Sequence, residues 1–137
     1  MSMFRVLDIS SAGLSVEQAR LEAASANLAN ANTTRTKDGA MYQPLSVVVG
    51  SQSVGIDRMI TKPTVVDVVP TNAEPRQVYE PGHPDANEKG FVTKPGVDTL
   101  STMMDLMSIS RSYEANLRVF DITRTLLQKT LEMGSRS

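Results

Sequence analysis

The chain contains no cysteine and no tryptophan, and only three phenylalanines and three tyrosines. Without cysteine there can be no disulfide, no thiolate catalysis and no cysteine-based zinc site. With so few large aromatic side chains, a core would have to rely on Leu, Val, Ile and the eight methionines. At 137 residues and a net charge of -1, the sequence predicts one modest domain that lacks the basic surface needed to bind nucleic acid.

Long apolar runs are missing as well. No window of the sequence approaches the ~18 apolar residues that suggest a membrane span. The first residues, MSMFRVLDISSAGL, show no basic leader followed by a continuous apolar stretch. We therefore expect no direct membrane insertion and no cleaved signal peptide, so the chain is either cytosolic or exported by another route.

The motifs of common enzyme sites are also missing. The sequence has no nucleophile elbow and no phosphate-binding glycine loop. His83 lies near Asp85 and Glu88, but one histidine and two carboxylates in a Pro/Gly-rich loop favour a solvated turn over a metal site. We expect no catalytic residue, no metal, no cofactor and no small-molecule substrate.

The distribution of proline divides the chain into three parts. All seven prolines lie from Pro44 to Pro95, and proline breaks the interior of a helix. The sequence therefore predicts a mainly α fold, with long N- and C-terminal helices packing as a coiled-coil-like pair and a small, irregular, β-hairpin-containing middle segment. The expected boundaries are 1–36, 37–96 and 97–137.

Short β-branched runs in the middle segment predict edge strands or hairpins. These runs are Leu45–Val49, Val54–Ile60, Thr64–Val69 and Arg76–Glu80. Pro81 and Gly82 then fit the central positions of a type II turn, which would open a polar loop over residues 81–90.

The N-terminal segment carries two stripes of residues on opposite sides of the expected helix. Four leucines recur every seven residues: Leu7, Leu14, Leu21 and Leu28. Small residues form the second stripe, at spacings of four and three: Ala12, Val16, Ala19, Ala23, Ala26 and Asn30. Such alternation is typical of a coiled-coil seam, so we expect this helix to contact partners on both sides.

The C-terminal segment predicts one helix from about residue 98 to residue 133. Its main apolar repeat consists of Met103, Leu106, Ser110, Tyr113, Leu117, Phe120, Arg124, Leu127 and Leu131. A second face holds Ile109, Asn116, Val119, Leu126 and Met133. Periodicity alone allows the two helices simply to pack on each other within a monomer. The apolar and small residues on the remaining faces favour an additional partner.

Three asparagines stand where the first helix is expected to end, within ASANLANANTTRT. Asn27 and Asn30 lie one turn apart, where their amides could bond a neighbouring helix or backbone and fix its register. Asn32 could adopt the left-handed conformation that ends a helix. The alternative is plain C-capping by one asparagine, which does not require three.

Three ordered motifs carry a resemblance over nearly the whole chain. They are ANLANANTT (Ala26–Thr34), YEPGHPDANEKGFV (Tyr79–Val92) and SRSYEANLRVFD (Ser110–Asp121). The first and last resemble the signatures of the flagellar basal-body rod, hook and hook-associated axial proteins. The central motif and the short length are similar to the proximal rod members of that family.

This resemblance implies a structural protein rather than an enzyme. It implies self-assembly with other axial proteins into the helical drive shaft around the export channel, with the terminal helices forming the inner tube. Implied partners are other flagellar rod subunits, basal-body proteins and the flagellar type III export apparatus. The implied location is the rod, which spans the periplasm in the basal body.

We assign the expected subunit contacts to residues of both helices. They are Leu7, Leu14, Leu21, Leu28, Ala19, Ala23, Ala26, Asn27, Asn30, Leu106, Tyr113, Asn116, Leu117, Phe120, Leu127 and Leu131. A soluble helical-hairpin adaptor or chaperone-like binding module is the alternative function.

Overall fold

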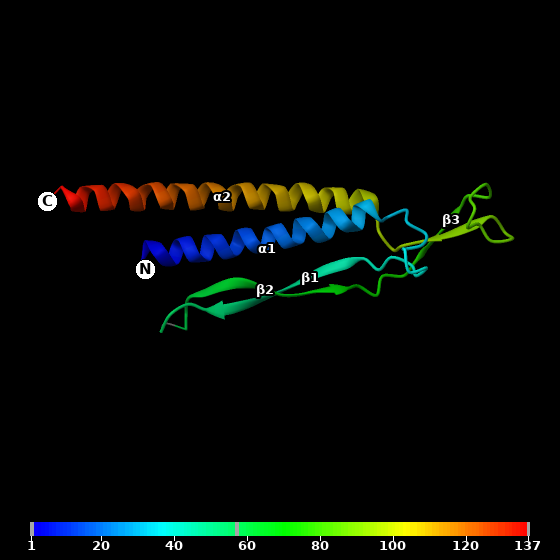
Figure 1. Cartoon of the computed structure of the whole chain (residues 1–137), viewed down its shortest axis with the longest axis horizontal. Helices are drawn as coiled ribbons and strands as arrows, with labels where there is room; N and C mark the ends of the chain where they lie inside the picture. The colour runs from blue at the N-terminus through cyan, green and yellow to red at the C-terminus, as the bar shows by residue number, and fades with distance from the viewer. Residues whose placement is uncertain (1, 57, 137) are drawn as a thin grey trace.

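The computed structural model describes residues 2–56 and 58–136. Its elements, in chain order, are α1 (Met3–Ala29), β1 (Leu45–Ser53), β2 (Thr61–Pro70), β3 (Arg76–Tyr79), β4 (Phe91–Lys94) and α2 (Thr99–Ser135). Helix α1 lies between α2 on one side and the β1–β2 hairpin on the other, while β3 and β4 project beyond the end of the helices (Figure 1). The prediction of two terminal helices with a small hairpin-containing middle is confirmed.

The two helices run in opposite directions and differ in length (Figure 1). Asp98 is the N-cap of α2: its carboxylate accepts the Leu100 N–H at 3.1 Å, and its carbonyl accepts the Thr102 hydroxyl at 2.7 Å. Since α2 has 37 residues and α1 has 27, the C-terminal turns of α2 extend past the start of α1 (Figure 1). In the described part of the chain, no other helix lies beside these last turns.

The β1–β2 hairpin is antiparallel and pairs Leu45 with Pro70 at its root. Its strands contain the predicted runs of residues 45–49 and 64–69, and both extend beyond them. The prediction of a strand over Val54–Ile60 is wrong. This stretch is the turn of the hairpin, closed by a 2.9 Å hydrogen bond from the Val54 N–H to the Ile60 carbonyl.

The physical reason for that turn is a backbone conformation rather than a hydrophobic pattern. Gly55 has a φ of 77°, which glycine adopts at little cost and β-branched residues avoid. The apolar residues beside it read like a strand in the sequence, although the chain reverses there. Asp57, which belongs to the predicted run, lies outside the described residues.

The β3–β4 hairpin pairs Arg76 with Lys94 and Tyr79 with Phe91. The predicted strand over residues 76–80 is confirmed as β3, whereas β4 was not predicted because Phe-Val-Thr-Lys is too short to show an alternation. The chain does turn at Pro81-Gly82, where the His83 N–H reaches the Glu80 carbonyl at 3.0 Å. A type II turn requires a positive φ at its third residue, which here would be Gly82. Gly82 does not have a positive φ, so the prediction of a type II turn is wrong.

The buried apolar residues form two small groups. Val16 and Ala23 are buried on α1, whereas Ala31, Val92 and Val97 are buried in the segment after α1, in β4 and just before α2. Of the residues that the structure describes in α2, none is buried. The junction is thus the best-packed part of the chain, and α2 leaves much of its surface open.

Candidate assembly site

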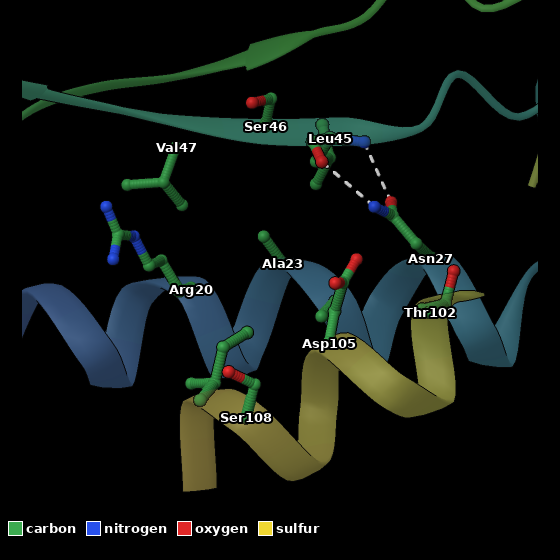
Figure 2. Close-up of a pocket in the computed structure, with 11 residues that line it drawn as sticks. Arg20, Ala23, Asn27, Leu45, Ser46, Val47, Thr102, Asp105 and Ser108 are labelled. Carbon is green, nitrogen blue, oxygen red and sulfur yellow. Dashed lines mark hydrogen bonds between the residues drawn. The ribbon is translucent and has the colours of Figure 1, made fainter. Parts of the chain in front are cut away.

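Asn27 ties α1 to the β1–β2 hairpin. Its Nδ2 donates to the Leu45 carbonyl at 2.9 Å, and its Oδ1 accepts the Leu45 N–H at 2.7 Å (Figure 2). The Tyr42 hydroxyl donates to the same Oδ1 at 2.9 Å. Because Leu45 offers one donor and one acceptor, this side chain bonds the edge of β1 as a residue of a third strand would.

The other two asparagines have different partners. The Asn30 Nδ2 donates to the Ala26 carbonyl at 2.8 Å, and its Oδ1 accepts the Thr33 hydroxyl at 3.3 Å, so this residue closes the last turn of α1. The Asn32 Oδ1 accepts a hydrogen bond from Arg76 at 3.3 Å. No described residue other than glycine has a positive φ, so the prediction of a left-handed Asn32 is wrong.

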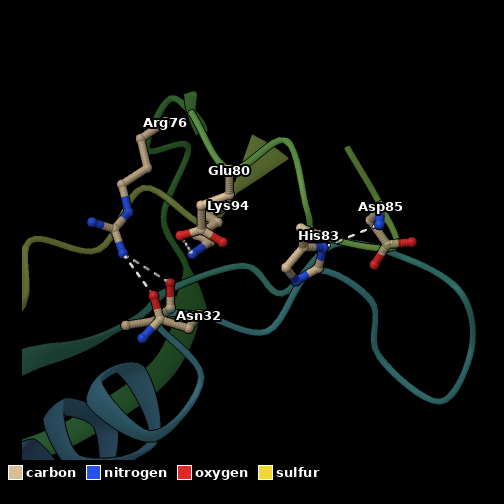
Figure 3. A network of polar contacts seen from close by, with 7 residues as sticks. Asn32, Arg76, Glu80, His83, Asp85 and Lys94 are labelled. Carbon is tan, nitrogen blue, oxygen red and sulfur yellow. Dashed lines mark hydrogen bonds and ion pairs between the residues drawn. The ribbon is translucent and has the colours of Figure 1, made fainter. Parts of the chain in front are cut away.

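Charged residues join β3 to the segment that follows α1 and link the two strands of the β3–β4 hairpin (Figure 3). Arg76 donates to the Ala31 carbonyl at 3.1 Å. Lys94, which is only 7% exposed, donates from its ammonium to the Glu80 carboxylate at 2.6 Å. This hydrogen bond is the main reason that the pKa of Glu80 lies below its ordinary value.

Asp85 anchors the polar loop to the same segment. Its carboxylate accepts the Thr34 hydroxyl at 2.6 Å and pairs with Arg35 at 3.2 Å, and the Thr34 bond is the main cause of its lowered pKa. The Asp85 N–H donates to the His83 Nδ1 at 3.0 Å (Figure 3). Within the described ranges, no group of three or more potential ligands of the His, Cys, Asp or Glu type could hold a metal ion.

The small-residue stripe of α1 faces the β1–β2 hairpin of the same chain. Ala19, Ala23 and Ala26 line a hollow of about 280 Å³ together with Leu45 and Val68. The small side chains allow the β1–β2 hairpin to approach α1. Nearer the start of α1, an ion pair of 3.1 Å between Asp8 of the helix and Lys62 of β2 also joins the two elements. The sequence could not assign this partner, and a contact of these alanines with a neighbouring subunit stays a prediction.

The four leucines of the other stripe, residues 7, 14, 21 and 28, are half-buried. None of these leucines is fully buried, whereas Val16 and Ala23 of the same helix are. Their expected contact with another subunit likewise stays a prediction.

The inner face of α2 differs in part from the predicted repeat. Among the described elements, α2 contacts α1 alone. Its half-buried residues recur at spacings of four and three: Thr102, Leu106, Ile109, Tyr113, Asn116, Phe120, Thr123 and Leu127. Leu117 and Leu131, which we expected in the same repeat, are exposed, and Ile109 and Asn116 turn inward.

A close approach explains the inward position of Asn116. A Cβ atom added at Gly13 would lie 3.2 Å from the Asn116 Nδ2. Glycine in α1 therefore makes room for this amide between the helices. The sequence contained two adjacent apolar repeats on α2, and only the packing of α1 selects which of them turns inward.

The opposite face of α2 is a long exposed stripe, which we call the outer stripe. Met104, Ile122 and Met133 are 64%, 61% and 74% exposed. Its residues recur at spacings of four, three and four: Leu100, Met104, Met107, Arg111, Ala115, Arg118, Ile122, Leu126, Lys129 and Met133. An 11-residue repeat stays nearly straight along an α-helix, and an apolar surface of this length usually has a partner.

Sequence reasoning placed Leu126 and Met133 on a second face but missed the rest of the outer stripe. The 11-residue repeat was the available signal, and the three cations within the stripe interrupt its apolar pattern. No helix in the described part of the chain is long and apolar enough to cross a membrane.

Comparisons with known proteins cover both helices. The family model described as "Flagella basal body rod protein" matches residues 7–37, and that described as "Flagellar basal body rod FlgEFG protein C-terminal" matches residues 88–133. The flagellar basal-body rod protein FlgC of Escherichia coli O6:H1 is 36% identical, over 98% of this chain and 99% of the relative. The FlgC proteins of Salmonella typhimurium (strain LT2) and Bacillus subtilis (strain 168) are each 34% identical, with the same shares covered.

Proposed function

The chain belongs to the FlgC family of flagellar basal-body rod proteins, and we propose that it builds the rod by packing the outer stripe of α2 against neighbouring subunits. It is a structural subunit of the flagellar basal body. The observation that carries the proposal is the outer stripe itself, because its apolar side chains lie on the side of α2 that faces away from α1. Burial of such side chains is the main source of free energy for association.

In this proposal the two terminal helices form the inner tube of the rod, and the middle segment lies outside it. The arrangement of the elements supports this view. The β1–β2 hairpin covers α1 on the side away from α2, so α2 forms one whole edge of the molecule (Figure 1). The half-buried residues of α2 repeat every seven residues, which supports a coiled-coil-like pairing with α1.

The remaining parts of the proposal follow from membership of the family. We propose that the flagellar type III apparatus exports the chain without a cleaved signal, and that the rod spans the periplasm. We propose no catalytic role, because the family is structural. The comparisons give no support to the soluble adaptor as an alternative function.

A charge placed in the outer stripe tests the proposal. Ile122→Asp would bury a carboxylate without a partner if a subunit covers the stripe, at a cost of several kcal/mol. We expect this variant to be secreted but absent from purified basal bodies. Ser112→Asp is the matched control, since residue 112 is exposed on α2 outside the outer stripe. Normal incorporation of Ile122→Asp would show that the stripe is not an assembly surface.

A further inference from the structure

One edge of the β1–β2 hairpin is open along β1. Leu45 directs its N–H and its carbonyl outward, where Asn27 bonds both of them. Outward and paired residues alternate along an antiparallel strand, so Val47 and Val49 also direct their backbone groups outward. The bulge places its extra residue, Val66, in β2, and the alternation along β1 therefore continues. In the part of the chain that the structure describes, this sheet has two strands, so no third strand covers the edge.

The opposite edge of the hairpin, along β2, is blocked. Pro70 lies opposite Leu45, and Pro63 lies opposite Ser51. Residues that face each other across an antiparallel pair point the same way relative to the ladder, so both prolines occupy outward positions. Proline has no N–H to offer a further strand and is a common device for protecting a sheet edge. The chain thus protects one edge of the hairpin from strand pairing and leaves the other available.

A trough runs along the open edge, with α1 as its floor, β1 as one wall and α2 as the other. Its first part, shown in Figure 2, is a hollow of about 290 Å³ that extends from Asn27 and Val47 to Ser108 of α2. Its second part is a hollow of about 280 Å³ lined by Val49 and by Asn116 of α2. Arg20 lines both hollows, so they follow each other along α1.

The dimensions and the chemistry of the trough suit a strand better than a helix. An added strand lies about 4.8 Å from its neighbour, whereas a helix with its side chains is about 10 Å across. The α2 wall carries polar side chains at Ser108 and Asn116, which can bond the second edge of such a strand. Asn27 already bonds β1 as a residue of a third strand would, and it marks the end of the trough.

We propose that an extended segment of another protein chain of the basal body binds in this trough as a third strand beside β1. Its main chain bonds the outward groups of Val47 and Val49, a mode of binding in which the backbone supplies affinity and the side chains supply specificity. Asp105 lines the trough and belongs to none of the ion pairs between described residues, whereas Arg20 is paired with Glu17. The segment therefore carries a lysine or an arginine where it faces Asp105.

A proline in β1 tests the backbone contact. Val47→Pro removes the outward N–H and leaves the pairing with β2 intact, as Pro63 and Pro70 do on the other strand. Val47→Ala is the matched control, because it shortens the same half-buried side chain and keeps the N–H. We expect Val47→Pro to enter isolated basal bodies roughly fivefold less than Val47→Ala, or lower still, since the carbonyl of the added strand would lose its donor. Equal incorporation of the two variants would overturn the inference.

A bulky side chain on α2 tests the trough without altering β1. Ser108→Trp would fill the trough from its α2 wall, and Ser108 is exposed, so the substitution leaves the packing of α2 on α1 unchanged. Ser110→Trp is the matched control, because Ser110 is an exposed serine on the other flank of α2. We expect Ser108→Trp to incorporate about tenfold less than Ser110→Trp. Equal incorporation of these two variants would likewise overturn the inference.

The combined results separate strand addition from other contacts. If Ser108→Trp blocks incorporation while Val47→Pro and Val47→Ala incorporate equally, a neighbour covers the trough through side chains alone and strand addition is wrong. The outer stripe is a different surface, and Ile122→Asp changes it without entering the trough. Normal incorporation of Ile122→Asp would refute the role of the outer stripe and leave strand addition standing, and normal incorporation of Val47→Pro would do the reverse.

Discussion

Asn27→Asp is the sharpest test of the link between α1 and the β1–β2 hairpin. The substitution keeps the shape of the side chain but replaces the Nδ2 donor by an oxygen. That oxygen would lie where the Nδ2 now donates to the Leu45 carbonyl, at 2.9 Å. Two acceptors would then face each other in a half-buried site.

The magnitude follows from the bonds that change. The lost hydrogen bond accounts for about 1 kcal/mol, and the opposed, poorly solvated acceptors add about 1–3 kcal/mol. The bonds from the Leu45 N–H and the Tyr42 hydroxyl remain and strengthen with the charge, which offsets part of the loss. We expect a net destabilisation of roughly 1–3 kcal/mol at neutral pH.

The pH dependence of this loss has a definite sign. The protonated carboxyl regains a donor, so the folded state favours protonation and the pKa of the carboxyl introduced at position 27 should rise. A cost of about 1–3 kcal/mol corresponds to a rise of about 1–2 units from about 3.9. Because the folded state binds this proton more tightly than the unfolded state, the deficit relative to the original chain should begin to shrink as the pH falls below about 6 and should be smallest below about 3.9.

Amide hydrogen exchange of β1 measures the effect. A loss of about 1–3 kcal/mol should accelerate exchange roughly 5- to 150-fold at neutral pH, and less in acid. Asn32→Asp is the matched control, since its new carboxylate would face the Arg76 guanidinium, 3.3 Å from the Asn32 Oδ1, and should leave β1 unchanged. Unchanged exchange in Asn27→Asp, or a loss that persists in acid, would refute this role of the hydrogen bonds between Asn27 and Leu45.

Two further predictions concern the β3–β4 hairpin. Gly90→Ala should destabilise it by about 1–3 kcal/mol, because Gly90 has a φ of 81° and a Cβ there would lie 2.8 Å from the Tyr79 ring. Gly82→Ala, whose Cβ would meet no atom within 4 Å, is the control, and equal melting temperatures for the two would contradict this account. Acid should loosen the same hairpin, because Glu80 and Asp85 have lowered pKa values and their contribution disappears as the pH falls below about 4. Amide exchange of residues 83–91 measures this loosening. Exchange rates that are equal at pH 7 and pH 3, after correction for the intrinsic rate, would contradict the prediction.

The sequence by itself determined the architecture of this protein at the level of segments. Proline is confined to the middle, and the apolar repeats at both ends have the period of a helix, so two terminal helices were predicted, and the expected helix from about 98 to 133 lies close to the observed bounds of α2. These signals are local, because each depends on residues within a few turns of one another. The ordered motifs likewise identified the family before any contact was known.

Local signals failed where the backbone conformation overrides the side-chain pattern. The run over residues 54–60 has the composition of a strand, but Gly55 adopts a left-handed conformation and makes it a turn. Strand β4 is too short for its alternation to stand out. Pairing with β3, rather than its own composition, defines it.

Only the tertiary structure decided which surface each face of the helices meets. Periodicity indicates that a face is covered, but it does not identify the cover: the alanines of α1 face β1 and β2, and Gly13 leaves room for the Asn116 amide of α2. An asparagine amide can bond any donor or acceptor within reach, so the sequence could not name Leu45 as the partner of Asn27. Such contacts join residues far apart in the chain, and their identity depends on the packing of the whole molecule.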